Sequence, residues 1–227
     1  MIINGINIKS IGCHLLRYRY TPSQYNGRSF WDNGVIYPII LEGSYGWSNL
    51  EIDIYIEDES AAGVERKKSQ LNALMENPLI ILDEVDSEIE YICAYENQVV
   101  VEKINEVASI ATYNFKAVKR GIEKSIPLNN LSNVITIEGT AMADATYEVT
   151  PKSDLIDFTI NDVILKNLTA NKTVIVDGLN KTVTVDGVNK FKDTDFLSFP
   201  KFKPGSHTIS LNRTNVTVIM KYHPRYA

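Results

Sequence analysis

The sequence has little cysteine and no long apolar stretch. Two cysteines in 227 residues, Cys13 and Cys93, are too few for a disulfide framework and lack the paired spacing of a zinc site. Both are predicted to be buried thiols in a reducing cytosol. The longest apolar runs are strand-length, far below the roughly 18 residues that a membrane helix needs, and the first residues do not follow the pattern of a secretory signal. We therefore expect neither a membrane span nor a secretory leader.

The charge is negative overall and unevenly distributed. Lys and Arg number 23 against 28 Asp and Glu, and this net charge of −5 disfavours nucleic-acid binding. Residues 1–150 hold 12 basic and 21 acidic side chains, whereas residues 151–227 hold 11 and 7. The resulting net charges of −9 and +4 predict two units. The turn-rich residues 125–133 are the expected linker, which gives an N-terminal domain at 1–127 and a C-terminal domain at 128–227.

One strand and one helix stand out in the first unit. Residues 50–56 alternate between apolar residues and Glu51, Asp53 and Tyr55, which is the pattern of a half-buried strand. Residues 58–60 supply caps and negative charge for a helix over 61–76. The residues predicted to share its apolar side are Val64, Leu71, Leu74 and Met75. Because the other signals are strands, we expect a mainly β chain whose N-terminal domain is barrel-like or sandwich-like with one α-helix.

The second unit reads as short strands separated by turns. A nine-residue echo relates residues 173–181 to residues 182–190, and each copy contains Asp-Gly after a β-branched run, a strong hairpin signal. Two copies are too few for a solenoid, so the aspartates are interpreted as turn residues rather than calcium ligands. A further hairpin is predicted from residues 207–211 and 216–222. This spacing predicts an antiparallel β-sandwich.

The sequence offers few residues for catalysis or metal binding. His14, His207 and His223 occur without a metal-binding or nucleophile-activating motif, and no phosphate-binding glycine loop is present. An acidic cluster could supply the two carboxylates of a glycosidase, but such clusters are usually solvated faces. The cluster consists of Asp83, Glu84, Asp86, Glu88 and Glu90. We therefore expect no enzyme, no catalytic residue, no cofactor and no metal, with a hydrolase as a minor alternative.

Aromatic residues are concentrated in one glycine-containing stretch, which we interpret as a long loop. Aromatic side chains on such a loop suit either a protein interface or a platform on which sugars stack. The aromatic residues between positions 18 and 47 are Tyr18, Tyr20, Tyr25, Phe30, Trp31, Tyr37, Tyr45 and Trp47. From this loop and the charged helix, the predicted partner-contact residues are Trp31, Tyr45, Trp47, Glu65, Arg66 and Lys68.

Segments from both halves resemble one family. Ile-Asn-Gly-Ile at residues 3–6, the charged segment Glu65-Arg66-Lys67-Lys68 before Leu71, and Phe115-Lys116-Ala117 are similar to the N-terminal domain of phage distal tail proteins (Dit). The echo, the segment 199–205 and the closing residues 221–226 look like the C-terminal half of the same family. The order of these elements carries the resemblance, which covers nearly the whole chain.

The resemblance implies a structural protein of the tail tip in phages or prophages of Gram-positive bacteria. Members of the family form homo-hexameric rings through their N-terminal domains, and the rings join the tail tube to the baseplate or tip. The C-terminal domain would be a galectin-like β-sandwich. The implied partners are the tail-tube protein, the tail-tip protein or tail-associated lysin, and receptor-binding proteins, with no membrane involved.

The resemblance also implies a place in the virion, after synthesis in the host bacterial cytoplasm. DNA would pass through the ring without specific binding, and the net charge of −9 in residues 1–150 motivates the hypothesis of an acidic channel. An alternative function is a carbohydrate-binding module that contacts host cell-wall saccharide. That alternative requires exposed aromatic side chains in the C-terminal half, which contains no tryptophan.

Overall fold

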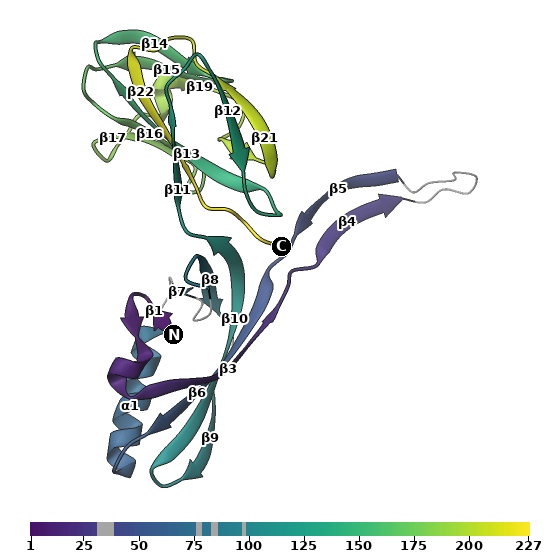
Figure 1. Cartoon of the computed structure of the whole chain (residues 1–227), viewed down its shortest axis with the longest axis vertical. Helices are drawn as coiled ribbons and strands as arrows, with labels where there is room; N and C mark the ends of the chain where they lie inside the picture. The colour runs from purple at the N-terminus through teal and green to yellow at the C-terminus, as the bar shows by residue number, and fades with distance from the viewer. Residues whose placement is uncertain (31–38, 76–78, 83–85, 97–98) are drawn as a thin grey trace. The chain divides into compact units, whose positions relative to one another are not determined.

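The chain divides into two compact units, Met1–Arg120 and Gly121–Tyr226 (Figure 1). The computed structural model describes the chain except residues 31–38, 76–78, 83–85 and 97–98. Within the described residues both units consist mainly of antiparallel strands, and a single α-helix lies in the first unit. The predicted mainly β architecture with one helix is therefore confirmed. No helix in the described part of the chain is long and apolar enough to cross a membrane.

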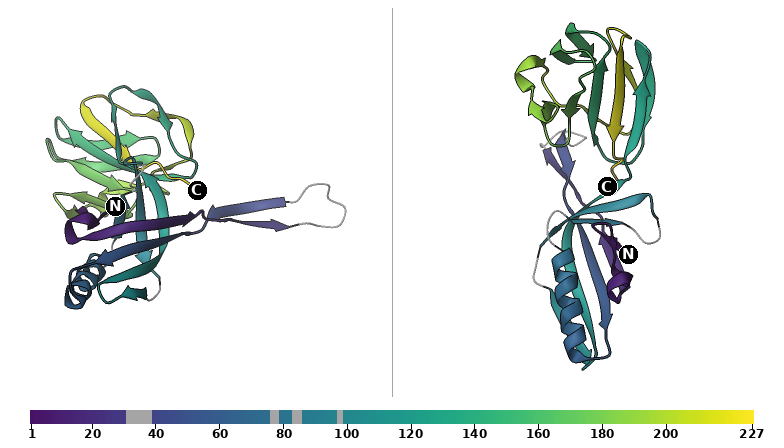
Figure 2. Two further views of the ribbon diagram at one scale, coloured as in Figure 1. Left: turned by 60° about the horizontal axis from the view of Figure 1, so that its bottom comes forward. Right: turned by 90° about the vertical axis from the view of Figure 1, so that its left-hand side faces the viewer.

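An eight-stranded antiparallel sheet forms the framework of the first unit. Its strands run in the order β2-β1-β7-β8-β10-β6-β3, and β9 adds to β10 outside this path. The sheet curls, as the views in Figure 2 show. The strands are β1 (Ile2–Ile3), β2 (Ile6–Asn7), β3 (Cys13–Thr21), β6 (Ser48–Glu57), β7 (Leu79–Leu82), β8 (Ile89–Tyr95), β9 (Val100–Asn105) and β10 (Ala108–Gly121), and a 3₁₀ turn, η1 (Ile8–Ile11), precedes β3.

Strand β6 shows the alternation that the sequence predicts. Leu50, Ile52, Ile54 and Ile56 are buried, and the residues between them are half-buried. Successive side chains of a strand point to opposite faces, so β6 has one face in the core and one face toward solvent. The core also takes up both cysteines, and the prediction of buried free thiols is confirmed.

Helix α1 (Ala61–Leu74) packs on the apolar face of the sheet beside β6 and η1. Ser60 is its N-cap, and the Ser60 side chain accepts a hydrogen bond from the backbone N–H of Gly63 at 3.1 Å. Val64, Leu71 and the C-cap residue Met75 are buried, as predicted. The helix ends two residues before the predicted position 76, and Leu74 is only half-buried because it lies in the last turn.

Removing the cap should destabilise the first unit. We expect Ser60→Ala to lower the free energy of unfolding by about 1 kcal/mol, because the Gly63 N–H loses its acceptor. The matched control Ser69→Ala changes an exposed serine within α1 and should be neutral or slightly stabilising. Both tryptophans belong to the first unit, so urea unfolding followed by tryptophan fluorescence reports on this unit. Equal effects of the two substitutions would contradict a capping role.

The described residues of the aromatic stretch lie mainly in β3 and in a β-ribbon rather than in the predicted loop. β4 (Tyr25–Phe30) and β5 (Ile39–Tyr45) pair antiparallel with each other and form a separate two-stranded sheet (Figure 1). A shift of register between Gly27 and Ser29 marks a bulge. Gly27 and Gly43 weaken the strand signal in the sequence, because glycine is depleted in strands. The sequence therefore predicts a loop at these positions.

The second unit is a sandwich of antiparallel strands in two layers. One layer is a seven-stranded sheet with the order β11-β22-β13-β16-β17-β18, to which β20 adds at β13. The other layer consists of the pair β12-β21 and the trio β14-β15-β19, which an isolated bridge between Ile160 and Leu211 connects. The strands are β11 (Lys124–Leu128), β12 (Ser132–Ile137), β13 (Ala143–Pro151), β14 (Leu155–Ile160), β15 (Val163–Leu168), β16 (Val174–Asp177), β17 (Thr182–Val185), β18 (Val188–Asn189), β19 (Thr194–Asp195), β20 (Lys201–Phe202), β21 (Gly205–Ser210) and β22 (Val216–Tyr222), with a 3₁₀ turn, η2 (Phe191–Asp193), before β19.

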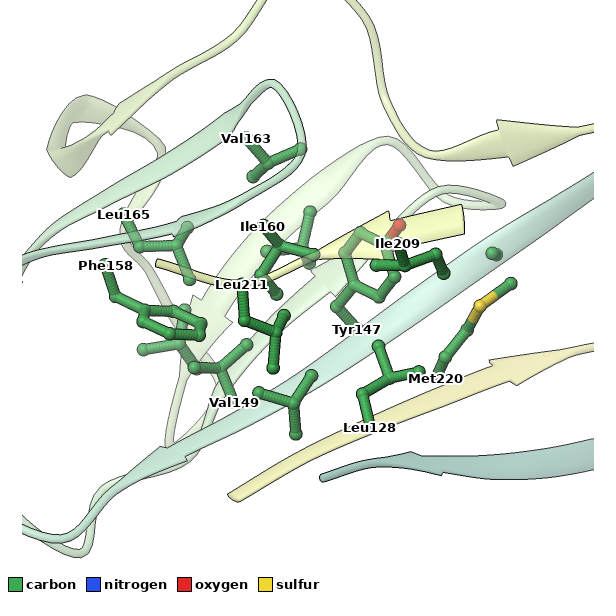
Figure 3. Packing of buried hydrophobic residues seen from close by; sticks show 14 of the residues in the cluster. Leu128, Tyr147, Val149, Phe158, Ile160, Val163, Leu165, Ile209, Leu211 and Met220 are labelled. Carbon is green, nitrogen blue, oxygen red and sulfur yellow. The ribbon is translucent and has the colours of Figure 1, made fainter. Parts of the chain in front are cut away.

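The core of the second unit lies between these two layers. Tyr147 and Val149 of β13 and Met220 of β22 point into it from the large sheet, and side chains from the other layer meet them (Figure 3). Each of these residues is less than a tenth exposed. The core residues from the second layer and its continuation are Phe158, Ile160, Val163, Leu165, Ile209 and Leu211. The predicted β-sandwich is thus confirmed.

The hairpin predictions for the second unit had mixed outcomes. The echo forms the adjacent strands β16 and β17, and Asp186-Gly187 is the two-residue turn from β17 to β18, with positive φ at both residues. The predicted pairing of residues 207–211 with residues 216–222 is wrong. β21 pairs with β12, whereas β22 pairs with β11 and β13, so the connection crosses from one layer to the other.

The expected linker at residues 125–133 also needs correction. Residues Lys124–Leu128 form β11, which pairs with β22 from Lys124↔Tyr222 to Leu128↔Val218. Asn133 lies in β12, where its side chain accepts from the N–H of Asn130 and donates to the carbonyl of Asn130. Pro127 is tolerated because β11 is an edge strand of its sheet.

Two glycines of the echo should respond differently to substitution by alanine. A Cβ at Gly178 would lie 2.3 Å from the carbonyl oxygen of Ala145 and 2.5 Å from that of Pro200, so backbone must move. Gly187 has open space around its Cα and needs only a positive φ of 77°. We expect a loss of local stability of about 3 kcal/mol for Gly178→Ala and about 1 kcal/mol for Gly187→Ala. Hydrogen exchange of β13 and β16 amides measures the effect at Gly178, and that of β17 and β18 amides measures the effect at Gly187. A larger effect at Gly187 would contradict the steric argument.

Candidate assembly surface

The residues considered for catalysis do not form a site in the described part of the chain. No group of three or more His, Cys, Asp or Glu side chains there could hold a metal ion. A ring nitrogen of His207 lies 2.7 Å from the carbonyl oxygen of Lys203, and one of His223 lies 3.0 Å from that of Gly121. Asp86 accepts from the backbone N–H of Glu88 in a turn, and Glu90 forms a 2.6 Å ion pair with Arg120. Asp83 and Glu84 lie outside the described residues.

Two of the predicted contact residues of the aromatic stretch, Tyr45 and Trp47, lie on or beside the β4–β5 ribbon. Tyr45 is the last residue of β5, opposite Tyr25. Trp47 lies between β5 and β6 with 65% of its surface exposed. Trp31 is outside the described residues. A tryptophan this exposed leaves a large apolar area in contact with water. This contact is unfavourable, and burial against another surface would remove it.

The β4–β5 ribbon is a sheet of two described strands. β4 and β5 pair only with each other among the described strands. An isolated two-stranded hairpin is at best marginally stable in water, because it has no second layer against which to bury a face. Open strand edges are also templates for pairing with other chains. The ribbon is therefore a candidate surface for pairing with another chain.

Two of the three predicted helix residues are exposed, and the third, Lys68, forms an ion pair with one of them. Glu65 and Arg66 are exposed on α1. The Lys68 ammonium lies 2.8 Å from the Glu65 carboxylate, one turn earlier on the same helix. The neighbouring Lys67 has a structural role instead, because its ammonium donates to the carbonyl oxygen of Glu57 at 2.6 Å and lies 3.0 Å from the carboxylate of Asp58.

The contact between Lys67 and Asp58 should be visible in a pH titration. The hydrogen bond from Lys67 holds the pKa of the Asp58 carboxyl below its ordinary range. A depressed pKa stabilises the fold at neutral pH, and that contribution is lost as the pH falls through the depressed value. We expect Lys67→Met to raise the pKa of Asp58 toward its ordinary range, because the lowering hydrogen bond is lost, with NMR of the carboxyl carbon as the measurement. The matched control Lys68→Met should leave the pKa of Asp58 unchanged, and an equal shift in both variants would contradict the specific contact.

Ion pairs cover the solvent face of the sheet, and sequence reasoning did not find them. The Arg17 guanidinium lies 2.6 Å from the carboxylate of Asp53, which also accepts a 2.8 Å hydrogen bond from Thr112. Arg19 lies 3.4 Å from Glu51. The signal was available as two arginines two residues apart in β3 and two carboxylates two residues apart in β6, but only the register of β3 against β6 brings them together. The acidic face of β6 is consequently neutralised by β3.

The same face contains a polar depression of about 290 Å³. Its lining includes Arg19 and Glu51 together with Lys116, which pairs with Glu96 at 3.1 Å and donates to Asn49 at 3.3 Å. Both signs of charge occur in it and partner each other. The depression therefore shows no preference for an anion or a cation.

In the second unit, the aromatic residues considered for sugar stacking differ in exposure. Phe158 and Tyr222 are buried in the core, and Phe196, Phe199 and Phe202 are half-buried against it. Phe191 is 49% exposed. Lys181 lies 5.7 Å from the centre of the Phe199 ring. One exposed phenylalanine over two half-buried rings thus remains as a surface feature of this unit.

Comparison with protein families gives a match in the second unit. Residues 138–226 match the model of the SPP1_Dit family, which is described as the C-terminal domain of the siphovirus-type tail component. A comparison with curated proteins found no match. The matched segment begins in the turn after β12 and includes every strand from β13 to β22.

Comparison with solved structures covers both units. The crystal structure of the SPP1 Dit (gp 19.1) protein, described as a paradigm of the hub adsorption apparatus in phages that infect Gram-positive bacteria, aligns over 100% of this chain and 98% of its own, with a TM-score of 0.75 and 13% identity. Chains of the phage p2 baseplate in its activated conformation, with Sr and with Ca, each align over 95% of this chain and 92% of their own, with a TM-score of 0.55 and 10% identity. At these identities the alignments show the fold. Together with the family match, they confirm the predicted resemblance to the distal tail proteins.

Proposed function

Since this chain has the Dit fold and its residues 138–226 match the model of the siphovirus-type tail component family, we propose that it is the ring-forming adaptor at the distal end of a phage tail. Six copies form the ring through their first units. The ring joins the tail tube on one side to the baseplate or tip proteins on the other. The role is structural, and the second units carry contacts to further tail proteins.

The β4–β5 ribbon is the observation that carries this proposal. A two-stranded sheet without a second layer is stabilised when a neighbouring subunit covers it, and a ring gives each subunit such a neighbour. Trp47 at the base of the ribbon supplies an exposed aromatic anchor of the kind that dominates protein interfaces. Tyr45 and Trp31 belong to the same proposed contact, and Glu65, Arg66 and Lys68 on α1 are proposed as further contact residues of the assembly.

The charge of the first unit is compatible with a DNA channel. Residues 1–120 hold 11 basic and 17 acidic side chains, so a ring of these units repels phosphate overall. The β6 face contributes little to this repulsion because Arg17 and Arg19 neutralise it. We propose that DNA passes through the ring without specific binding. The proposed protein partners are the tail-tube protein, the tail-tip protein or tail-associated lysin, and receptor-binding proteins.

Shortening the ribbon should abolish ring formation while the units stay folded. In the test variant, residues 27–43 are excised and Asn26 is joined to Ser44 through an Asn-Gly turn, which suits a two-residue hairpin. We expect the unaltered chain to form particles of six times 25.6 kDa, alone or with tail-tube protein, and the shortened chain to remain monomeric. Mass photometry and negative-stain electron microscopy measure both outcomes.

Trp47→Ala is the finer variant, with Trp47→Phe as its matched control because phenylalanine keeps an apolar ring. Truncation of an interface hot spot costs about 2 kcal/mol or more, so Trp47→Ala should weaken assembly at least about 30-fold. An unchanged far-UV circular dichroism spectrum shows that each variant is folded. Rings from the shortened chain, or monomers only from the unaltered chain in the presence of tail-tube protein, would contradict the proposal.

A further inference from the structure

An exposed apolar patch lies on the second unit around Phe191. We define the Phe191 patch as Leu179, Phe191, Phe196, Leu197 and Phe199. Leu197 is 103% exposed, Leu179 57% and Phe191 49%, so the outer members are in water. The half-buried rings of Phe196 and Phe199 contact Phe191 and pack against the sandwich core. Isolated exposed apolar residues are common, but a cluster on an aromatic base is typical of a binding surface.

The three rings of the patch form a fixed arrangement. The Phe196 and Phe199 centroids are 4.9 Å apart in an edge-to-face contact, and Phe191 lies 5.7 Å and 6.0 Å from them. The backbone N–H of Phe191 donates to the side chain of Asn189. On the other side of Phe191, Lys190 and Asp193 form a 3.0 Å ion pair across η2. A partner that binds here therefore does not need to order the surface first.

The charges around the patch leave a positive surface. Asp193 is paired with Lys190, and Asp144 lies 2.9 Å from Lys181. Asp195 lies 3.7 Å from Lys166, and Asp177 accepts hydrogen bonds from the backbone N–H groups of Leu179 and Asn180, so all four carboxylates have partners within the unit. Lys192 and Lys201 are exposed and form no ion pair with the described residues. Lys192 directly follows Phe191, and Lys201 follows Phe199 by two positions. The available charge beside the apolar side chains is thus cationic.

We propose that the Phe191 patch is a docking surface for a segment of another tail protein that presents an aliphatic or aromatic side chain flanked by carboxylates. This inference rests on the proposed function, because the partner is a protein of the same tail. The apolar side chain covers Leu197 and Phe191, and the carboxylates meet Lys192 and Lys201. A saccharide is disfavoured because the nearby acidic side chains are engaged within the chain, and a fully exposed leucine adds no stacking face.

Zero-length cross-linking tests the charge pairing directly. Tails are purified from the phage that encodes this chain and are treated with a water-soluble carbodiimide, which joins a lysine amine to a carboxylate in contact with it. We expect mass spectrometry to find Lys192 and Lys201 joined to Asp or Glu of a different tail protein. Lys152 is the matched control, because it is exposed on the same unit just after the far end of β13, whereas the patch lies near the start of that strand.

Two substitutions at Leu197 separate the apolar contribution from the charge. Leu197→Asp removes the aliphatic group and repels carboxylates, so the cross-link yield should fall about tenfold or more, as expected for losing about 1.4 kcal/mol at an interface. Leu197→Lys removes the same group but attracts carboxylates, so its yield should be clearly higher than that of Leu197→Asp. Because Leu197 is fully exposed, neither change affects folding.

Each contrary result has a separate meaning. Tails that contain this chain at the normal level but show no cross-link from Lys192 or Lys201 to another protein overturn the inference and leave the proposed function intact. Cross-links only to a second copy of this chain overturn it as well. Equal yields for the two Leu197 variants contradict the acidic character of the partner. Absence of this chain from tails overturns the proposed function, and the inference with it.

Discussion

The pairing of β6 with β10 is the constraint on which the first unit depends. The ladder runs without interruption from Ala108↔Glu57 to Ala117↔Ser48, so it fixes the face to which each side chain points. A slip of one residue would exchange Ile54 with Asp53, placing a carboxylate against α1 and an isoleucine beside Arg17. The buried side of β6 receives the helix, and its solvent side receives the arginines of β3. Core and charged surface are therefore consequences of one register.

In the second unit, the register of strand pairing constrains β13 in the same way, because β13 pairs with β22 on one side and β16 on the other. Tyr147 and Val149 are held at the centre of the sandwich by both neighbours, and the Phe191 patch forms where the chain leaves this sheet near β17 and β18. Gly178 allows the turn after β16 to lie against the carbonyl oxygens of Ala145 and Pro200. The rigid ladder thus positions an apolar surface that the turns alone could not hold.

Local signals in the sequence were sufficient where one segment determines its own structure. The alternation of residues 50–56, the cap at Ser60 and the turn Asp186-Gly187 each depend on neighbours within a few positions, and all three occur in the structure. Such local signals could not predict which strands pair when the strands are far apart in the sequence. Nothing local distinguishes a hairpin of β21 with β22 from strands in opposite layers, because both arrangements bury the same alternating residues. The ion pairs of β3 with β6 were missed for the same reason.

The surfaces that this protein leaves uncovered suit assembly better than catalysis. An enzyme needs convergent titratable groups, whereas here Glu90, Asp53 and Asp193 are each occupied by a cation of the same unit. Among the described residues, several uncovered groups are apolar or backbone groups: the edges of the β4–β5 ribbon, Trp47, and the side chains around Phe191. The free energy falls when another protein covers groups of this kind. A small molecule covers too little area to give the same stabilisation. The ribbon offers strand edges and the Phe191 patch offers fixed rings with free cations, so the two surfaces select partners of different chemistry.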